Sequence, residues 1–173
     1  MKLISHRGNM IGPNPSRENS PSYIDTAISA GYDVEVDINY LDNKFFLGHD
    51  TPDYEISETW IEKRKHKIWF HCKNLDVASR LCELQKNYDT PYMFFCHTSD
   101  KFVLTSTNHI WVHDLELNLN DKCIIPLLSD TDLISTTTKN VYAICTDYIN
   151  ISKSIYTWNQ QTYSRSACTL FKL

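Results

Sequence analysis

Short hydrophobic runs rich in β-branched and aromatic residues recur along the chain, separated by polar or amphipathic stretches. Such runs predict buried strands, whereas apolar residues spaced three and four apart predict helices. Strands are expected over residues 2–5, 33–40, 44–47, 67–72, 92–96, 102–104, 110–112, 124–128 and 141–145. Because strand and helix alternate through the first half of the chain, the pattern indicates a parallel α/β sheet.

The predicted helices cover residues 21–31, 55–66 and 75–86, with a short one around residues 133–134. The first has Ser20 and Pro21 at its start, which is typical of an N-cap followed by proline at the first helical position. Asn74 is the expected N-cap of the third helix. After residue 97 the predicted elements are mostly short strands, so the second half of the chain is expected to carry few helices.

Composition narrows the class of protein. A chain of 173 residues with 42% hydrophobic and 22% charged residues is typical of one soluble globular domain. The net charge of -4 argues against general nucleic-acid binding. No apolar run reaches the roughly 18 residues that a membrane span needs, and the first residues leave no room for the apolar core of a secretory signal.

The chain has 6 cysteines, and none of them forms a Cys-x-x-Cys motif. Cys72, Cys96 and Cys145 lie in apolar runs, where free cysteine behaves as a small buried hydrophobic residue. We therefore expect reduced, buried thiols and a cytoplasmic protein.

Four short clusters of polar residues lie in the first fifty residues, at or near the ends of predicted elements. They are His6-Arg7-Gly8, Glu18-Asn19, Glu35-Val36-Asp37 and His49-Asp50. Residues two apart on a strand face the same side, so the carboxylates of Glu35 and Asp37 point together. Two unpaired inward carboxylates would be costly, and a divalent cation that prefers oxygen ligands, such as Mg²⁺, Ca²⁺ or Mn²⁺, would relieve that cost.

In this order, the four clusters resemble the glycerophosphodiester phosphodiesterase family, whose pattern is His-Arg-Gly, Glu-Asn, Glu-x-Asp and His-Asp. The resemblance is specific over residues 3–50, weaker to about residue 75 and faint to residue 147. It implies the barrel of the phospholipase-C-like phosphodiesterase superfamily. A typical (β/α)8 barrel has about 250 residues, so this shorter chain is expected to form a reduced or incomplete TIM barrel that lacks several outer helices after residue 97.

The resemblance assigns the catalytic acid and base to His6 and His49. Imidazole titrates near neutral pH, so one histidine can accept a proton from the attacking oxygen while the other protonates the leaving oxygen. The sequence leaves open which histidine does which. Arg7 offers a planar donor fork that suits a phosphate or a neighbouring carboxylate, and we expect it to bind phosphate or to orient the acidic residues.

Lys73 matches the lysine of the family's Glu-x-Lys element and is expected to stabilise charge on the phosphate oxygens. His71 departs from the family, which places a third carboxylate ligand there, as the spider-venom sphingomyelinase D relatives also do. A nitrogen ligand favours Mn²⁺ or a similar transition metal over Mg²⁺. The alternatives are that Glu18 or water completes the metal site begun by Glu35 and Asp37, or that no metal binds. Glu18 is also a candidate partner of Arg7.

Thr146-Asp147 resembles the end of the last barrel strand of the family. This resemblance indicates a barrel core over residues 1–150, a C-terminal appendage over residues 151–173 and one domain in all. Trp111 and residues 97–100 follow the predicted fourth strand and are candidates to line the mouth of the barrel.

The motifs and the resemblance together predict a metal-dependent phosphoric diester hydrolase acting on a glycerophosphodiester or a related phospholipid-derived diester. Neither a nucleic-acid partner nor stable membrane insertion is expected, and the oligomeric state is left open. One alternative is a catalytically degenerate binding protein with the same fold. A lipase acting at a membrane is disfavoured because no basic amphipathic helix is evident. A purely structural role would require coincidence across four motifs.

Overall fold

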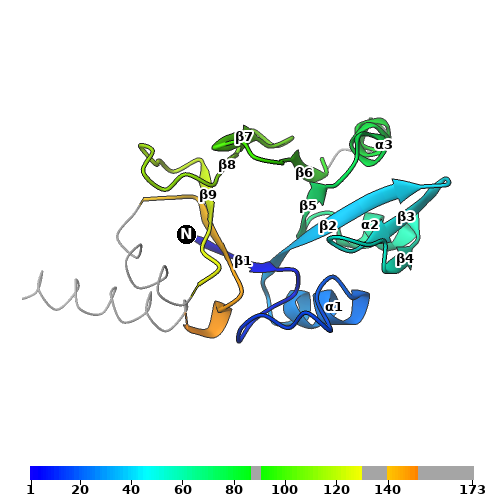
Figure 1. Ribbon diagram of the computed structural model, residues 1–173, viewed down its shortest axis with the longest axis horizontal. Coiled ribbons are helices and arrows are strands. Elements are labelled where there is room, and N and C mark those ends of the chain that lie inside the picture. The colour runs from blue at the N-terminus through cyan, green and yellow to red at the C-terminus, as the bar shows by residue number, and fades with distance from the viewer. Residues whose placement is uncertain (87–90, 130–139, 152–173) are drawn as a thin grey trace, which may run out of the picture.

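The computed structural model describes residues 1–86, 91–129 and 140–151 (Figure 1). The helices are α1 (Pro21–Ser29), α2 (Glu58–Arg64) and α3 (Leu75–Gln85). The strands are β1 (Lys2–His6), β2 (Asp33–Leu41), β3 (Lys44–Leu47), β4 (Tyr54–Ile56), β5 (Ile68–Cys72), β6 (Met93–Cys96), β7 (Phe102–Leu104), β8 (Ile110–Val112), β9 (Cys123–Pro126) and β10 (Ala143–Thr146).

Eight of these strands form a sheet that curls around a central axis in the order β6-β5-β2-β1-β10-β9-β8-β7 (Figure 1). The strands from β6 to β8 run parallel, and β7 runs antiparallel to β8. No ladder joins β6 to β7 in the described residues. Instead, Ser106 donates its backbone N–H to the Phe94 carbonyl at 2.9 Å, and its Oγ accepts the Phe94 N–H at 2.8 Å. The predicted incomplete TIM barrel is confirmed.

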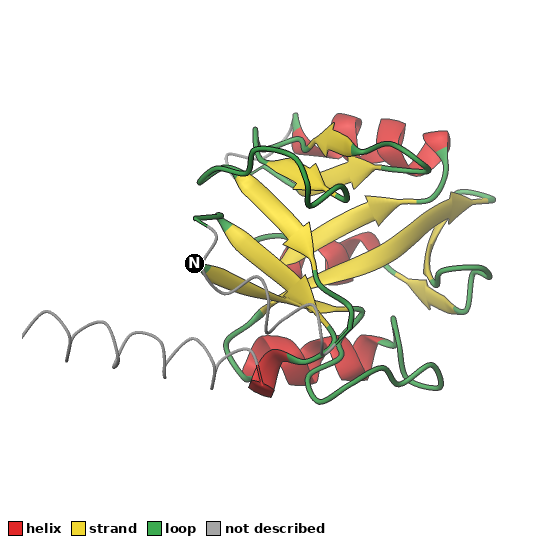
Figure 2. Ribbon diagram, turned by 60° about the vertical axis from the view of Figure 1, so that its left-hand side comes forward, coloured by secondary structure: helices red, strands yellow, loops and turns green. Residues whose placement is uncertain are grey.

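Helices α1, α2 and α3 lie on the outer face of the first half of the barrel (Figure 2). Between β6 and β9, residues 97–122 contain two short strands and turns but no helix. The expected loss of outer helices after residue 97 is therefore confirmed for this stretch. The short helix expected at residues 133–134 and the appendage beyond residue 151 lie outside the described residues.

Strand β2 continues past the rim of the barrel. Its last four residues pair with β3, which in turn pairs with β4, so a small antiparallel extension follows β1 along the same edge of β2. The helix predicted over residues 55–66 is wrong at its start, because residues 54–56 form β4. Helix α2 begins at Glu58, where Ser57 is the N-cap and its Oγ accepts the backbone N–H of Trp60 at 3.1 Å.

Alternation along the strands separates the core into an inner and an outer layer. In β2, Val34, Val36 and Ile38 point outward into the core beneath the helices, so Glu35 and Asp37 face the interior. The interior is filled by apolar side chains from most strands of the barrel, namely Ile4, Trp69, Phe95, Trp111, Ile124, Ala143 and Cys145. Glu35 and Asp37 lie toward the carboxyl-terminal rim of the parallel strands, where TIM barrels carry their active sites.

The cysteines of the described residues are free, and Cys72 and Cys145 are buried as expected. The prediction is wrong for Cys96, which is exposed because it is the last residue of β6 and lies at the rim. None of the helices in the described part of the chain is long and apolar enough to cross a membrane.

Candidate active site

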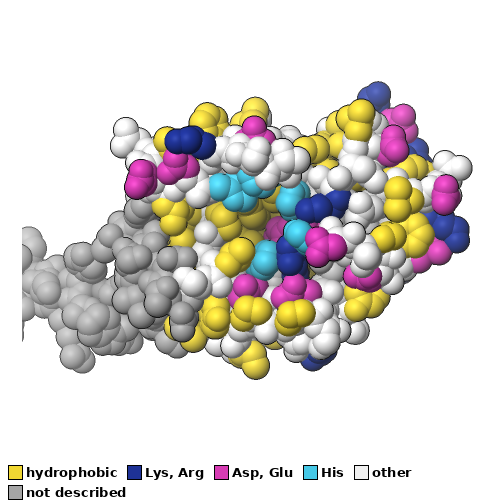
Figure 3. Space-filling view, in the orientation of Figure 1, with side chains coloured by type: hydrophobic (Ala, Val, Ile, Leu, Met, Phe, Trp, Pro, Cys, Tyr) yellow, Lys and Arg dark blue, Asp and Glu magenta, His cyan; other side chains and the backbone are white. Residues whose placement is uncertain are grey.

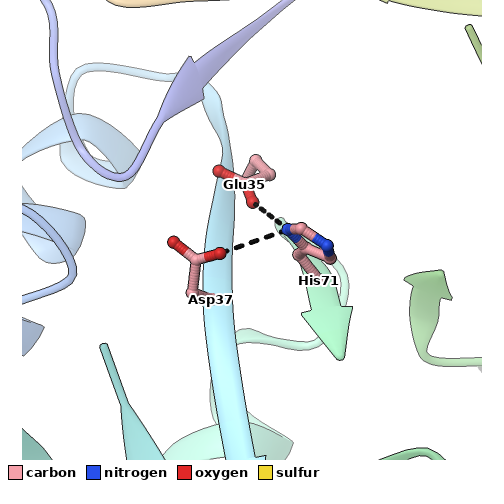
Figure 4. A group of neighbouring side chains, drawn as sticks. All are labelled: Glu35, Asp37 and His71. Carbon is pink, nitrogen blue, oxygen red and sulfur yellow. Dashed lines mark ion pairs between the residues drawn. The ribbon is translucent and has the colours of Figure 1, made fainter. Parts of the chain in front are cut away.

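Two carboxylates and an imidazole meet at the rim of the barrel (Figure 4). Glu35 and Asp37 come from β2 and His71 from β5, where Asp37 and His71 are register partners. His71 Nδ1 lies 3.1 Å from Asp37 Oδ1 and 3.7 Å from Glu35 Oε1. One ligand atom from each of the three residues lies within 4.8 Å of the others, so they can share one metal ion. We call these three residues the acidic cluster.

The two carboxylates of the acidic cluster have pKa values shifted in opposite directions. Burial raises the pKa of Glu35, and the charge of Asp37 raises it further. For Asp37, burial acts in the same direction, but contact with His71 and the charge of Arg7 outweigh it and hold the pKa well below its usual range. Glu35 Oε2 is buried and accepts no hydrogen bond from the described residues. An orphaned carboxylate oxygen beside two further ligands fits a divalent cation, and the mixed nitrogen and oxygen donors suit a metal such as Mn²⁺.

Arg7 bridges the acidic cluster to Glu18. Its Nε lies 2.8 Å from Asp37 Oδ2, and its Nη1 lies 3.2 Å from Glu18 Oε2. The backbone of Arg7 is left-handed, with φ at 53°, a conformation that costs a non-glycine residue roughly 1–2 kcal/mol. This turn directs the guanidinium back over the rim. Of the two roles considered for Glu18, the structure places it as the partner of Arg7, outside the acidic cluster.

Two asparagines complete this network, and sequence reasoning assigned neither of them a place in it. Asn19 donates its Nδ2 to Asp37 Oδ2 at 3.0 Å, and its Oδ1 accepts the backbone N–H of Asp37 at 3.0 Å. Asn9 is buried and donates its Nδ2 to Glu18 Oε1 and to Asp147 Oδ1, at 2.9 and 2.7 Å. The available signal was the position of Asn19 directly after Glu18 in a motif.

His6 ends β1 and is held by the carboxylate of Asp147, which directly follows β10. Its Nδ1 lies 2.8 Å from Asp147 Oδ1, and its Nε2 lies 3.8 Å from Glu35 Oε2. Burial lowers the pKa of His6, but the hydrogen bond to Asp147 and the charge of Glu35 outweigh it, so the pKa is raised. With its Nδ1 on Asp147, His6 turns Nε2 toward the acidic cluster. Asp147 entered the sequence analysis only as the end of a strand, so its contact with His6 was missed.

Two cavities adjoin at His71, which lines both of them. The first, of about 360 Å³, is lined on one side by His6, Arg7, Glu35 and His71, and we call it the His6 cavity. The second, of about 720 Å³, is lined by residues that include His49, Lys73 and His97, and we call it the His49 cavity. Figure 3 shows histidine, basic and acidic side chains gathered around a hollow in the middle of this face.

Lys73 and His49 stand on the far side of His71 from His6. Lys73 Nζ lies 3.5 Å from Asp37 Oδ1, whereas the His49 side chain pairs with Asp50 at 2.7 Å. The loop that carries His49 is tied to β2, because the N–H of Gly48 donates to the Asp37 carbonyl at 3.1 Å. The structure thus joins all the predicted site residues except His49 in one network, and it places His49 in the adjoining cavity.

Comparison with known proteins gives a match among solved structures. No family model matches the sequence, and no curated protein matches it. Among solved structures, the chain is similar to the crystal structure of a glycerophosphodiester phosphodiesterase from Agrobacterium tumefaciens str. C58. The TM-score is 0.57 at 14% identity, and the match covers 91% of this chain and 99% of that one. This chain has the same fold. At that identity the similarity concerns the fold alone, and the chemistry has to be argued from the site.

Proposed function

We propose that this protein is a metal-dependent phosphoric diester hydrolase that acts on a glycerophosphodiester or a related phospholipid-derived diester. The observation that carries the proposal is the position of His6 Nε2, 3.8 Å from a carboxylate of the acidic cluster at the barrel rim. A proton-transfer group thus stands beside a site for a cation. The shared fold and the four motifs of the resembling family support the same function.

Glu35, Asp37 and His71 would hold the metal. When bound, a divalent cation neutralises charge on a non-bridging phosphate oxygen and helps to position the diester. Arg7 and Lys73 flank the acidic cluster on opposite sides of Asp37 and supply further positive charge for the phosphate. Because Arg7 and Lys73 already contact Asp37, their positions are set before a substrate arrives.

His6 and His49 would move the protons. A hydroxyl next to the phosphate attacks phosphorus, and its proton passes to one imidazole while the other imidazole protonates the departing alcohol oxygen. The cyclic phosphate that results is then opened by water, with the proton transfers reversed. Asp147 holds Nδ1 of His6, so that Nε2 is the nitrogen directed toward the substrate. The molecule that this site would bind is therefore a small phosphodiester. That the chain forms a single domain and that the protein is cytoplasmic stay predictions.

A metal and substrate screen tests this function. Glycerophosphodiesters are offered with Mg²⁺, Mn²⁺ or Ca²⁺, with and without chelator, and hydrolysis is expected only with metal and most rapidly with Mn²⁺. Calorimetry of Mn²⁺ binding compares Glu35→Gln with Glu55→Gln, an exposed glutamate of β4 that pairs with Lys44. Binding should be lost only in Glu35→Gln. Equal Mn²⁺ binding by both variants would remove the metal site from the proposal.

The second candidate function is a catalytically degenerate protein that binds a phosphodiester without cleaving it. The observation that favours it is His71, which stands where the resembling family supplies a carboxylate ligand. This candidate predicts metal and diester binding without turnover. Metal-dependent cleavage of any diester in the same screen would exclude it.

A further inference from the structure

The two sides of the His6 cavity differ in chemistry. Its charged wall comes from neighbouring strands β1, β2 and β5, which carry His6, Glu35 and His71. The rest of the lining comes from β6, which pairs with β5, and from β8 and the end of β9, on the other arm of the curled sheet. It consists of Phe95, Trp111, Pro126 and Leu128, together with His113. We call the four apolar residues the apolar wall.

The aromatic rings of the apolar wall are poorly placed to attract a cation. Phe95 is stacked between His71 and Trp111, with ring centroids 4.9 and 4.1 Å away and interplanar angles of 9° and 18°. Both faces of the Phe95 ring are therefore covered, and only its edge can meet a ligand. Aromatic edges carry positive partial charge, whereas cation–π attraction requires a free face. This geometry disfavours a quaternary ammonium group, such as that of choline, against Phe95.

Charge is also scarce on this side of the cavity. Among the residues that the structure describes, those on this side of the cavity include no carboxylate that could pair with an ammonium group. Of the described residues on this side, His113 alone is ionisable. Burial, and then the charge of the nearby His97, lower the pKa of His113 to about 4. At neutral pH this ring is uncharged. Leu128, 41% exposed, extends the apolar surface to the mouth of the cavity, where a ligand can reach it.

Resting on the proposed phosphodiesterase function, we propose that the His6 cavity binds one alcohol arm of the diester and selects an uncharged, apolar alcohol. Leu128, Trp111 and Phe95 are the specificity-determining residues. The phosphate lies at the acidic cluster, where the two cavities adjoin at His71, and the other arm extends into the His49 cavity beside Lys73. The diester thus has one polar arm and one apolar arm.

The sharpest test compares two alcohols of the same shape. Glycerophosphocholine is assayed against its neohexyl analogue, in which carbon replaces the quaternary nitrogen and the charge is removed. We expect kcat/KM for the neohexyl diester to be at least about tenfold higher, because an ammonium group without a partner loses hydration in an apolar cavity and the neohexyl group does not. A preference for glycerophosphocholine would overturn the inference, and so would equal rates.

Matched variants connect the selectivity to the apolar wall. Leu128→Asn should lower the neohexyl-to-choline ratio by about tenfold. Leu104→Asn is the control, because Leu104 is a 68% exposed leucine of β7 that does not line the cavity, and the ratio should stay unchanged. An unchanged ratio in Leu128→Asn would contradict the assignment. Trp111→Phe, which retains a ring in the stack, provides a second variant with the same expected direction.

A binding experiment separates failure of this inference from failure of the proposed function. Calorimetry measures neohexyl phosphate and phosphocholine binding to the Mn²⁺-loaded protein. Tighter binding of neohexyl phosphate, lost in Leu128→Asn, supports the apolar subsite even if no diester is cleaved, and in that case only the hydrolase proposal fails. Cleavage of both diesters without selectivity leaves the hydrolase standing and refutes the apolar subsite.

Discussion

The two histidines proposed as acid and base lie in contrasting surroundings. His6 is the last residue of a central strand. Its side chain is 14% exposed and contacts two buried carboxylates. The side chain of His49 is 42% exposed, and it pairs with Asp50, which is 90% exposed. One end of the site is built into the barrel, and the other is carried by a loop beyond β3.

The difference shows that this site is preorganised in two ways. Side chains fix His6, through Asp147 and the network of Asn9 and Glu18. Backbone hydrogen bonds fix the loop of His49, since Gly48 donates to the Asp37 carbonyl and Asp53 donates to the Leu47 carbonyl. Changes to side chains around His6 should therefore alter its electrostatics, whereas changes around His49 should act through loop position.

Removing either imidazole should have the largest effect. His6→Ala and His49→Ala are each expected to lower kcat by about 10²–10⁴-fold, the usual contribution of a general acid or base. Only His6→Ala should also lower the thermal unfolding midpoint, because it leaves Glu35 and Asp147 without that partner. Rates on a glycerophosphodiester and thermal melts check both statements. Full activity in either variant would contradict the assignment of the pair.

Replacing the carboxylate beside each histidine should show that His6 depends on its carboxylate more strongly than His49 does. Asp147→Asn is expected to lower kcat by roughly 10–100-fold, by analogy with the loss that follows when the carboxylate partner of a metal-bound histidine is replaced. It should also lower the pKa of His6, because the negative charge that favours the imidazolium is gone. The limb of the pH–rate profile that belongs to His6 then moves to lower pH.

Asp50→Asn is the matched control for Asp147→Asn. Because Asp50 is exposed, water replaces its contact with His49, and the rate should change by less than about threefold. Equal losses in the two variants would mean that the two histidines are held in the same way.

The local pattern of apolar and polar residues was enough to predict the fold where the strands were long and rich in apolar residues. Strand β2, predicted over 33–40 and observed over Asp33–Leu41, alternates apolar residues that pack beneath the helices with polar residues that face the interior. Strand β4 was missed because Tyr54–Ile56 is short and depends on pairing with β3. The antiparallel direction of β7 could not be predicted from the local sequence either, since strand direction depends on how the strand pairs with its partner.

Site residues could be predicted from short motifs where they lie close together in the sequence, as Glu35 and Asp37 do. Contacts between distant segments were not predicted. His6 and Asp147 are 141 positions apart, and they meet because β1 and β10 are neighbours, with Ser5 beside Thr146. A sequence can place both residues at strand ends, but only barrel closure makes them partners. The apolar wall depends in the same way on β6, β8 and β9 facing the motif strands.

Glycine substitutions should test the backbone support of His49. A Cβ at Gly48 would lie 2.0 Å from the Thr51 carbonyl oxygen and 3.0 Å from the Asp53 nitrogen, so the loop must shift. Gly48→Ala is expected to lower kcat/KM about threefold to tenfold, since small misplacements of a reacting group are costly. Gly31→Ala is the control, because its φ is also positive, at 96°, but its Cβ would meet nothing within 4 Å. It should cost about 1 kcal/mol of stability and leave activity unchanged. Equal activity of the two variants would show that the loop tolerates displacement.

The smallest expected effect concerns a second pair of histidines, His97 and His113, whose pKa values are lowered whereas that of His6 is raised. The rings of His97 and His113 are stacked with centroids 3.5 Å apart, and burial lowers the pKa of His113 to about 4 from its ordinary value of 6.5. Above pH 6.5 the ring is neutral in the folded and the unfolded chain, so it does not change stability. Between pH 6.5 and about 4 the unfolded chain binds a proton that the folded chain does not, and stability falls as the pH falls.

His6 and His71 act in the opposite direction in the metal-free protein. Their raised pKa values contribute stability that is fully present below pH 6.5 and is lost as the pH rises through the folded values. In chelator, His113→Asn should therefore flatten only the acid limb of a plot of unfolding free energy against pH. The change should stay below about 1.4 kcal/mol per pH unit, because one imidazole binds at most one proton and solvent screens the ring, which is only partly buried. An acid limb that is identical in the variant would show that His113 is protonated equally in both states, and that the stack imposes no cost on its charge.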